Sequence, residues 1–289
     1  MKKDFYGYYY KLEKGMTHLA LIVARHGDTA SLQIVTDDTN QTLAYKADAF
    51  SEIREEDGTL TIRLGNSVFS DHGICLREKT ADTDLRGDLR FSNRVRPQGD
   101  IMGPFRFVPH MECRHMLRSI CYTVHGQLNY NGKKYDFSGG TGYTEGDRGV
   151  SFPSPYFWTH SFFADGKSLM LAVARIPYMG LAFTGTIGFY YDGSREHRFA
   201  TYRGARVLTF RDRTVRVKQG KYLLSVVPGN TDGRKLLAPV NGNMTRKIRE
   251  TLSGEVRYQL ICGKRVLLDE VAACASYEWE VPEVKESER

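Results

Sequence analysis

Short runs of alternating apolar and polar residues dominate the chain and predict β-strands. In residues 59–64, Leu60, Ile62 and Leu64 share one face, while Thr and Arg occupy the other. This period of two is typical of a half-buried strand. Tight glycine turns, several of them Asn-Gly or Asp-Gly, separate such runs and supply the positive φ angles of hairpins. They lie at residues 26–28, 56–58, 130–132, 164–166, 191–193 and 261–263.

Helical spacing is found in one region near the end of the chain. Met244, Ile248 and Leu252 recur at intervals of four, with Asn243 as a candidate N-cap and Gly254 as a stop. We expect one short helix there. Elsewhere, many short strands joined by tight turns indicate barrels or sandwiches. The predicted fold class is all-β, with two antiparallel β-barrel or sandwich units and this one short helix.

Turn signals lie on both sides of the glycine-rich segment 139–142 and predict a division near residue 145. We therefore expect an N-terminal β domain over 1–145 and a C-terminal β domain over 146–289. The apolar content of 41% is enough to bury a substantial core. The glycine-rich segment lacks both the phosphate-loop pattern and a following helix, so nucleotide binding is not predicted.

The chain carries a net charge of +7, and its Arg and Lys residues are dense in 203–221. There they alternate with Val and Phe, which favours a hairpin with a solvated basic face over a nucleic-acid groove. No nucleic-acid partner is predicted. An alternative is transient contact of this face with an anionic membrane surface. No apolar run approaches the length of a membrane-spanning helix, and the start shows no secretory signal. We therefore expect a cytoplasmic protein. If the basic face contacts a membrane, the protein would be peripheral to it. The oligomeric state is left open.

Three stretches carry candidate chemistry, and the first is 99–115. If extended, it places His110, Glu112 and Arg114 on one strand face. His110 and Glu112 could then exchange protons over a ligand, or the face could be solvated with an Arg–Glu pair. Cys113 and His115 could share a face as metal ligands, but no second pair accompanies them. Neither a metal site nor a cofactor is predicted.

The second stretch, 136–153, contains Glu145 and Asp147, which share a face if the chain is extended. Repulsion between two such carboxylates can raise the pKa of one and keep it protonated as an acid. The alternative is an exposed turn in which the acids pair with Arg148.

The third stretch, 154–163, alternates Trp158, His160 and Phe162 onto one face. An imidazole between two large aromatic rings is expected to be buried, which favours its neutral form. His160 is then either a satisfied core histidine or a proton carrier that faces a ligand.

Together these stretches resemble the tocopherol cyclase family. The segments that carry the resemblance are 99–112, 143–153, 156–161, 176–177, 198–202 and 237–244, followed by Ile248 and Glu250. The resemblance implies two lipocalin-like β domains related to carotenoid 1,2-hydratases and lipocalin-like pericyclases. It also implies an apolar small-molecule ligand, because family cyclases close a ring by adding a phenol oxygen across a double bond of a prenyl tail.

The chain departs from the family at four positions. Gly146 and Arg148 stand where the cyclases tend to have Lys and Trp, while Tyr156 and His160 stand in place of Trp and Gln. The acids remain, but the expected site is more polar and has fewer large aromatic faces.

We expect a cofactor-independent cyclase or related isomerase that acts on a prenylated or polyene substrate. The alternatives are a non-catalytic carrier of a hydrophobic ligand and a hydratase of a terpenoid double bond. Asp147 or Glu145 is expected as the acid and His160 as its proton partner, with Glu112 and His110 as further catalytic candidates. The predicted ligand contacts are Tyr143, Arg148, Tyr156, Trp158 and Phe162.

Overall fold

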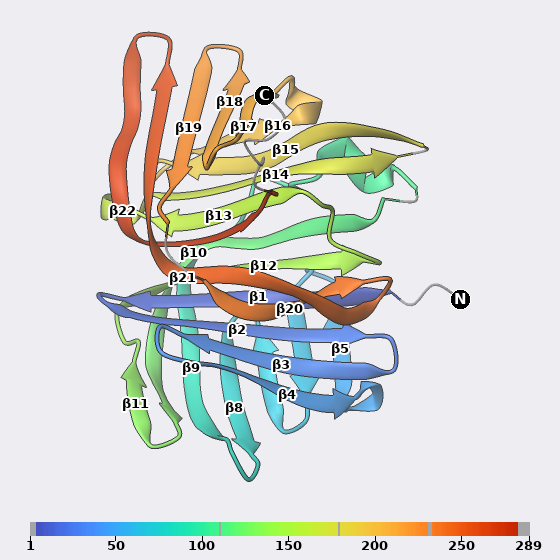
Figure 1. Ribbon diagram of the computed structural model, residues 1–289. Helices are drawn as coiled ribbons and strands as arrows, with labels where there is room; N and C mark the ends of the chain where they lie inside the picture. Colours follow the sequence, from blue (N-terminus) through green and yellow to red (C-terminus); the bar gives the residue numbers. More distant parts are fainter. Residues whose placement is uncertain (1–3, 110, 179, 231–232, 283–289) are drawn as a thin grey trace. The chain divides into compact units, whose positions relative to one another are not determined.

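The computed structural model describes residues 4–109, 111–178, 180–230 and 233–282. Strands make up nearly all of its regular structure, as the alternating pattern predicts (Figure 1). The helical elements in these ranges are short 3-10 segments: η1 (Ala47–Ala49), η2 (Gly103–Phe107), η3 (Ala164–Gly166) and η4 (Thr201–Arg203). None of the helices that the structure describes is long and apolar enough to cross a membrane.

The chain divides into two compact units, and it passes between them more than once. Unit 1 consists of Met1–Asp100, Arg114–Ser151 and Pro239–Thr245. Unit 2 consists of Ile101–Cys113, Phe152–Ala238 and Arg246–Arg289. The division predicted at residue 145 lies inside a strand of unit 1.

Unit 1 is built on an antiparallel sheet of 12 strands. The strand order is β4-β3-β2-β1-β12-β10-β9-β8-β7-β6-β5, and β11 pairs with β10. Figure 1 shows the first four strands in blue. The strands are β1 (Phe5–Lys14), β2 (Thr17–His26), β3 (Thr29–Thr36), β4 (Asn40–Lys46), β5 (Phe50–Arg54), β6 (Leu60–Leu64), β7 (Ser67–Ser70), β8 (Gly73–Lys79), β9 (Asp84–Val95), β10 (Cys113–Tyr130), β11 (Lys133–Asp136) and β12 (Gly140–Gly149).

One apolar core holds unit 1 together. Leu43 on β4 and Ile62 on β6, which lie near opposite ends of the strand order, belong to the same buried cluster as Tyr10 on β1. The sheet must therefore curve around the cluster, because a flat sheet would keep its two ends apart. The buried Leu60, Ile62 and Leu64 face of β6 confirms the alternation predicted for this segment.

Unit 2 is built on an antiparallel sheet of 10 strands with the order β16-β15-β14-β13-β22-β21-β19-β18-β17, with β20 paired to β21. Contacts between β15 and β17 bring the two ends of this order together, so the sheet is nearly closed as a barrel. The strands are β13 (Tyr156–Phe162), β14 (Ser168–Tyr178), β15 (Leu181–Tyr191), β16 (Glu196–Ala200), β17 (Arg206–Arg211), β18 (Thr214–Gln219), β19 (Tyr222–Pro228), β20 (Arg234–Val240), β21 (Asn243–Cys262) and β22 (Arg265–Glu280).

The predicted hairpins are confirmed. All six glycine turns join antiparallel neighbours, namely β2–β3, β5–β6, β10–β11, β13–β14, β15–β16 and β21–β22. The basic segment forms the hairpin β17–β18, in which Val215 and Val217 are buried while Arg216 and Lys218 are exposed. Fold class therefore follows directly from turn chemistry and alternation.

The expected short helix is wrong. Met244, Ile248 and Leu252 lie in the long strand β21. A spacing of four fits a helix, but it is also an even number and so fits one face of a strand. The burial of Ile248, Glu250 and Leu252 around the exposed Arg249 shows that the period is two.

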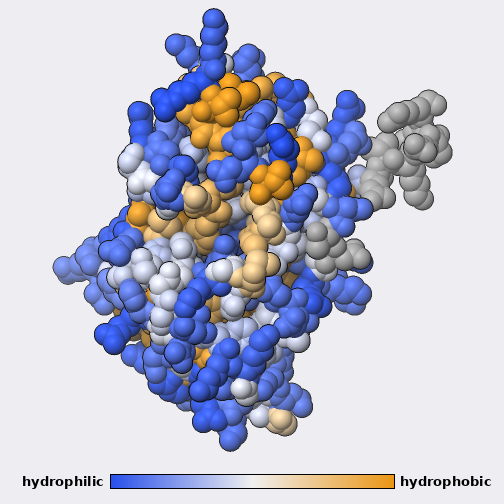
Figure 2. All heavy atoms as spheres, turned by 90° about the vertical axis from the view of Figure 1, so that its left-hand side faces the viewer, coloured by the Kyte–Doolittle hydropathy of each residue, from blue (hydrophilic) through white to orange (hydrophobic). Residues whose placement is uncertain are grey.

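The surface in Figure 2 is mostly hydrophilic, with an apolar area in the upper part of this view. Unit 2 contributes exposed apolar side chains on β19 and on the β21–β22 hairpin, namely Val227, Val266 and Val271. Val227 and Val271 lie in one row of the sheet, on either side of Arg257.

A buried ion cluster joins three strands of unit 1. Asp71, which is 1% exposed, lies 2.9 Å from Arg94 Nη2 and also accepts a hydrogen bond from Arg118. The backbone N–H of Leu60 donates to the same carboxylate over 3.1 Å. One carboxylate thus neutralises part of the charge of two guanidinium groups that burial has removed from water.

We expect Asp71→Asn to lower the free energy of unfolding of unit 1 by about 3 to 5 kcal/mol, because it leaves two largely buried cations without their anion. Urea unfolding followed by circular dichroism measures the change. The matched control is Asp88→Asn, which breaks the exposed pair between Asp88 and Arg77 and should leave the curve almost unchanged. Equal effects of the two substitutions would show that the Asp71 cluster does not stabilise the fold.

Candidate functional site

The two faces of β12 contact different surroundings. On the face toward the unit 1 core, Gly142 and Gly146 lie against tyrosine rings: a Cβ would be 2.0 Å from Tyr122 Cε2 at Gly142 and 2.8 Å from Tyr8 Cδ1 at Gly146. Thr144 between them meets the hydroxyl of Tyr122 at 3.0 Å. The glycine-rich stretch is therefore a strand that tyrosine side chains approach closely.

Tyr143, Glu145 and Asp147 project from the opposite face of β12, since successive side chains of a strand alternate. Tyr143 and Glu145 are buried, and the Asp147 side chain is 24% exposed. The predicted common face of the two acids is thus confirmed, and Glu145 is not part of an exposed turn.

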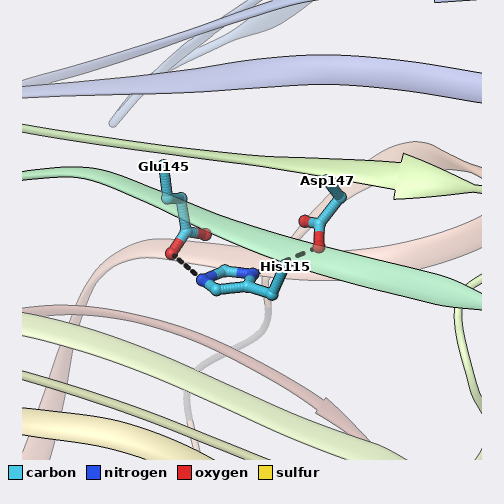
Figure 3. A group of neighbouring side chains, drawn as sticks. All are labelled: His115, Glu145 and Asp147. Carbon is cyan, nitrogen blue, oxygen red and sulfur yellow. Dashed lines mark hydrogen bonds and ion pairs between the residues drawn. The ribbon is translucent and has the colours of Figure 1, made fainter. Parts of the chain in front are cut away.

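His115 on the neighbouring strand β10 lies between the two carboxylates (Figure 3). Its Nε2 is 3.1 Å from Glu145 Oε2, and its Nδ1 is 3.1 Å from Asp147 Oδ1. The phenol of Tyr143 donates a hydrogen bond to Glu145. Hydrogen bonds and an ion pair therefore join four side chains from two adjacent strands, and we call this group the His115 cluster.

The charges of this cluster favour a proton on the imidazole. Burial by itself disfavours the imidazolium, but the charges of Glu145 and Asp147 and their hydrogen bonds outweigh it and raise the pKa of His115 well above 6.5. Burial and the charge of Glu145 likewise raise the pKa of Tyr143 well above its usual range. The imidazolium therefore donates to Asp147 and forms an ion pair with Glu145, and the phenol keeps its proton.

Among the described residues, His115, Glu145 and Asp147 form a group that could hold a metal ion, because one donor atom of each lies within 4.8 Å of the others. The two ring nitrogens of His115, however, lie on opposite sides of the imidazole and each already faces one carboxylate at hydrogen-bond distance. An ion bound to either nitrogen would have to replace the proton between that nitrogen and its carboxylate. The observed distances fit a shared proton.

The first candidate stretch is not a continuous strand. It contains the 3-10 segment η2, in which Gly103 has a φ of 52° and is followed by Pro104, and β10 begins only at Cys113. Glu112 is half-buried in the bend before β10. His110 lies outside the described residues. The expected strand face of His110, Glu112 and Arg114 is therefore wrong, and the roles assigned to His110 and Glu112 stay predictions.

The third candidate stretch is strand β13 of unit 2. His160 and Phe162 make an edge-to-face ring contact at 4.7 Å, as expected for residues that share a strand face. His160 is fully buried, and its Nε2 lies 3.0 Å from Ser168 Oγ. This contact gives Nε2 a hydrogen-bond partner, while both roles that the sequence left open for His160 stay predictions.

Tyr156 and Trp158 on the same strand are also buried. Tyr156 donates to Glu278 on β22, and burial with the charge of Glu278 raises the pKa of Tyr156 well above its usual range. The guanidinium of Arg246 lies 5.6 Å from the Tyr156 ring. The ligand contacts assigned to Tyr156, Trp158 and Phe162 stay predictions.

Arg148 is exposed and occupies the face of β12 opposite to Asp147. It lies 5.8 Å from the ring of Tyr6 and 4.0 Å from Asp4. The Arg148 side chain leaves β12 on the side opposite to Glu145 and Asp147. The alternative in which Arg148 pairs with these acids is therefore wrong.

His115 is the member of the cluster that the sequence did not connect to the acids. The sequence pattern associates it only with Cys113, as an unsupported pair of metal ligands. Its contact with Glu145 and Asp147 depends on the adjacency of β10 and β12, which no local pattern encodes. The one sequence signal that could have pointed to His115 is its position in a segment with the alternating pattern of a strand.

We predict that His115 remains protonated at neutral and mildly alkaline pH, in contrast to His26, whose pKa burial lowers from 6.5. Nitrogen-15 NMR of the imidazole rings would follow both residues, with His115→Gln assigning the signal. Since its folded-state pKa is raised, the stability it contributes is complete below 6.5 and is lost as the pH rises through the raised value. A His115 signal that titrates at or below that of His26 would contradict this arrangement.

Comparisons with known proteins place the fold and the family. The family model described as tocopherol cyclase-like matches residues 94–279, which is more than half of the chain. The structure is similar to that of a protein assigned as AttH from Nitrosomonas europaea (TM-score 0.51, 15% identity), which covers 98% of this chain and 94% of the other. It is also similar to kievitone hydratase from Nectria haematococca (TM-score 0.54, 10% identity), with 96% and 89% of the chains covered.

No curated protein matches the sequence. At identities this low, the two structural likenesses show the fold alone. The match to the family model extends from the end of β9 through β12 and β13 to β22, and so includes the whole His115 cluster. The chain belongs to the tocopherol cyclase-like family.

Proposed function

We propose that this protein binds an apolar, unsaturated small molecule and protonates one of its carbon–carbon double bonds to start an intramolecular cyclisation. The observation that carries the proposal is the position of the His115 ring between the carboxylates of Glu145 and Asp147. Membership of the tocopherol cyclase-like family supports the substrate class.

Within the cluster, Asp147 is the member best suited to meet a substrate. Its side chain is 24% exposed, whereas those of Glu145 and His115 are 7% and 10% exposed. His115 would pass its proton to Asp147, and Glu145, held by Tyr143, would stabilise the charge that remains. His115 thus takes the place of His160 as the proposed proton partner of the acids.

The proposed reaction is balanced without a cofactor. The cluster transfers a proton to one alkene carbon, which leaves a tertiary cation at the other. A phenol oxygen of the same substrate then bonds to the cation, and the phenol proton returns to the cluster. The product is an isomer of the substrate. Burial of the cluster favours this chemistry, because bulk water would compete for both the proton and the cation.

Two alternatives use the same residues differently. In a hydratase, water instead of the phenol oxygen traps the cation; one structural neighbour is itself a hydratase. In a carrier, the ligand is bound and released unchanged.

We predict that the protein converts a member of a panel of prenylquinols to a product of equal mass, with one deuterium bound to carbon when the reaction runs in deuterium oxide. Asp147→Asn should reduce turnover by about 100-fold to 10,000-fold, because it removes the proton donor. His115→Gln should do the same, and Glu145→Gln should have a smaller effect. Mass spectrometry of the product provides the measurement.

The control variant is Asp88→Asn, which neutralises an exposed carboxylate of unit 1 and should keep full turnover. A product heavier by one water would favour the hydratase. Unchanged turnover in both Asp147→Asn and His115→Gln would remove the His115 cluster from the mechanism.

Ligand binding by unit 2 has a separate test, because the chain has two tryptophans. Trp279 packs against Phe157 and Phe210 in the unit 2 core, so Trp279→Phe leaves Trp158 as the reporter. We expect a prenylquinol to quench the Trp158 fluorescence saturably, with or without Asp147→Asn. Saturable quenching without any product would favour the carrier, and no quenching would contradict Trp158 as a ligand contact.

A further inference from the structure

A pocket lies in unit 1 on the core-facing side of β12. Its volume is about 510 Å³, and its walls come from β1, β2, β5, β10 and β12. The His115 cluster projects from the other face of β12 and contributes nothing to this wall. The pocket is therefore distinct from the proposed site of proton transfer.

The wall of this pocket contains a row of three side chains across three adjacent strands. Tyr6 on β1 is the register partner of Arg25 on β2 and of Arg148 on β12. Neighbouring strands are about 4.8 Å apart, so the two arginines start about 10 Å apart with the tyrosine between them. The guanidinium of Arg148 lies 5.8 Å from the centre of the Tyr6 ring. An aromatic face is thus flanked by two cations.

The third arginine of the pocket is already neutralised. Arg54 Nε lies 2.6 Å from Glu52 Oε1, and its Nη2 donates to the Tyr8 hydroxyl over 2.6 Å. Tyr8 in turn donates to Glu52 over 2.9 Å. These contacts hold one wall of the pocket in place, and the negative charge of Glu52 is compensated by Arg54.

The positive charges of Arg25 and Arg148 are not compensated in the same way. Arg148 approaches the Asp4 carboxylate only to 4.0 Å, and both side chains are more than 60% exposed. Arg25 forms no ion pair within the described residues. Among the described residues of the lining, three arginines accompany the two acids Asp4 and Glu52, which gives a net charge of one positive unit.

We propose that this pocket binds a small organic monoanion with a flat unsaturated body, of the aryl carboxylate class. The carboxylate lies between Arg25 and Arg148, which present planar donors to it. The ring of the ligand stacks on Tyr6, and Met116 supplies an apolar contact. A net lining charge of one matches a monoanion better than a phosphate, whose second charge would lack a partner. This site is independent of the proposed cyclisation.

Isothermal titration calorimetry with 2-naphthoate tests the proposal, with the neutral 2-naphthamide as the ligand control. Arg25→Gln and Arg148→Gln should each weaken naphthoate binding by about threefold to tenfold, since each removes a charged hydrogen bond at a partly exposed site. Raising the salt concentration should weaken binding to the wild-type protein. Arg63→Gln, at an exposed arginine of β6 outside the pocket, is the matched control and should bind as the wild type.

Equal binding of the naphthoate and the amide, or unchanged binding in the Arg25→Gln, Arg148→Gln double variant, would overturn the proposal. Loss of naphthoate binding in Asp147→Asn would also overturn it, because the ligand would then occupy the His115 cluster. Tyr6→Leu should weaken binding while Tyr6→Phe keeps it. None of these outcomes depends on whether prenylquinols are turned over, so this proposal and the proposed function can fail separately.

Discussion

The two-sided packing of β12 is the constraint on which the site depends. Gly142 and Gly146 let the rings of Tyr122 and Tyr8 come as close as the strand backbone permits, and this fixes which side of β12 faces the core. The intervening Tyr143, Glu145 and Asp147 must then project on the other side. A single residue inserted into β12 would exchange the two faces and bring carboxylates against the tyrosines. The glycines therefore determine the position of the acids although they carry no chemistry themselves.

Burial of charge explains why the acids need His115. Two carboxylates removed from water repel each other and lack solvation, which is unfavourable unless a cation or hydrogen-bond donors accompany them. The imidazolium donates to Asp147 and forms an ion pair with Glu145, and the Tyr143 phenol donates a hydrogen bond to Glu145. The result is a group that keeps a mobile proton at neutral pH in a place that water reaches poorly. This is the property on which the proposed protonation of an alkene depends.

Neighbouring residues on β12 serve two different chemistries because they leave the strand on opposite sides. Asp147 belongs to the His115 cluster, whereas Arg148 lies in one row with Tyr6 and Arg25 on the other face of the strand. Arg148 stands where the family tends to have Trp. This difference therefore changes the core-facing pocket of unit 1 and does not change the side of β12 that carries Glu145 and Asp147. The acids keep their arrangement because their partners come from β10 and from β12 itself.

Local chemistry in the sequence determined the all-β fold, the six hairpins and the common face of Glu145 and Asp147, because turns and alternation act between residues close in the chain. It misjudged 244–252, since a spacing of four fits both a helix and a strand, and only neighbouring strands decide between them. It also did not connect His115 with the acids or Arg25 with Arg148. These contacts depend on which strands pair in the sheet, and pairing over long separations is set by the packing of the whole core. The sequence by itself determined the elements and the acids, and the tertiary structure decided their partners.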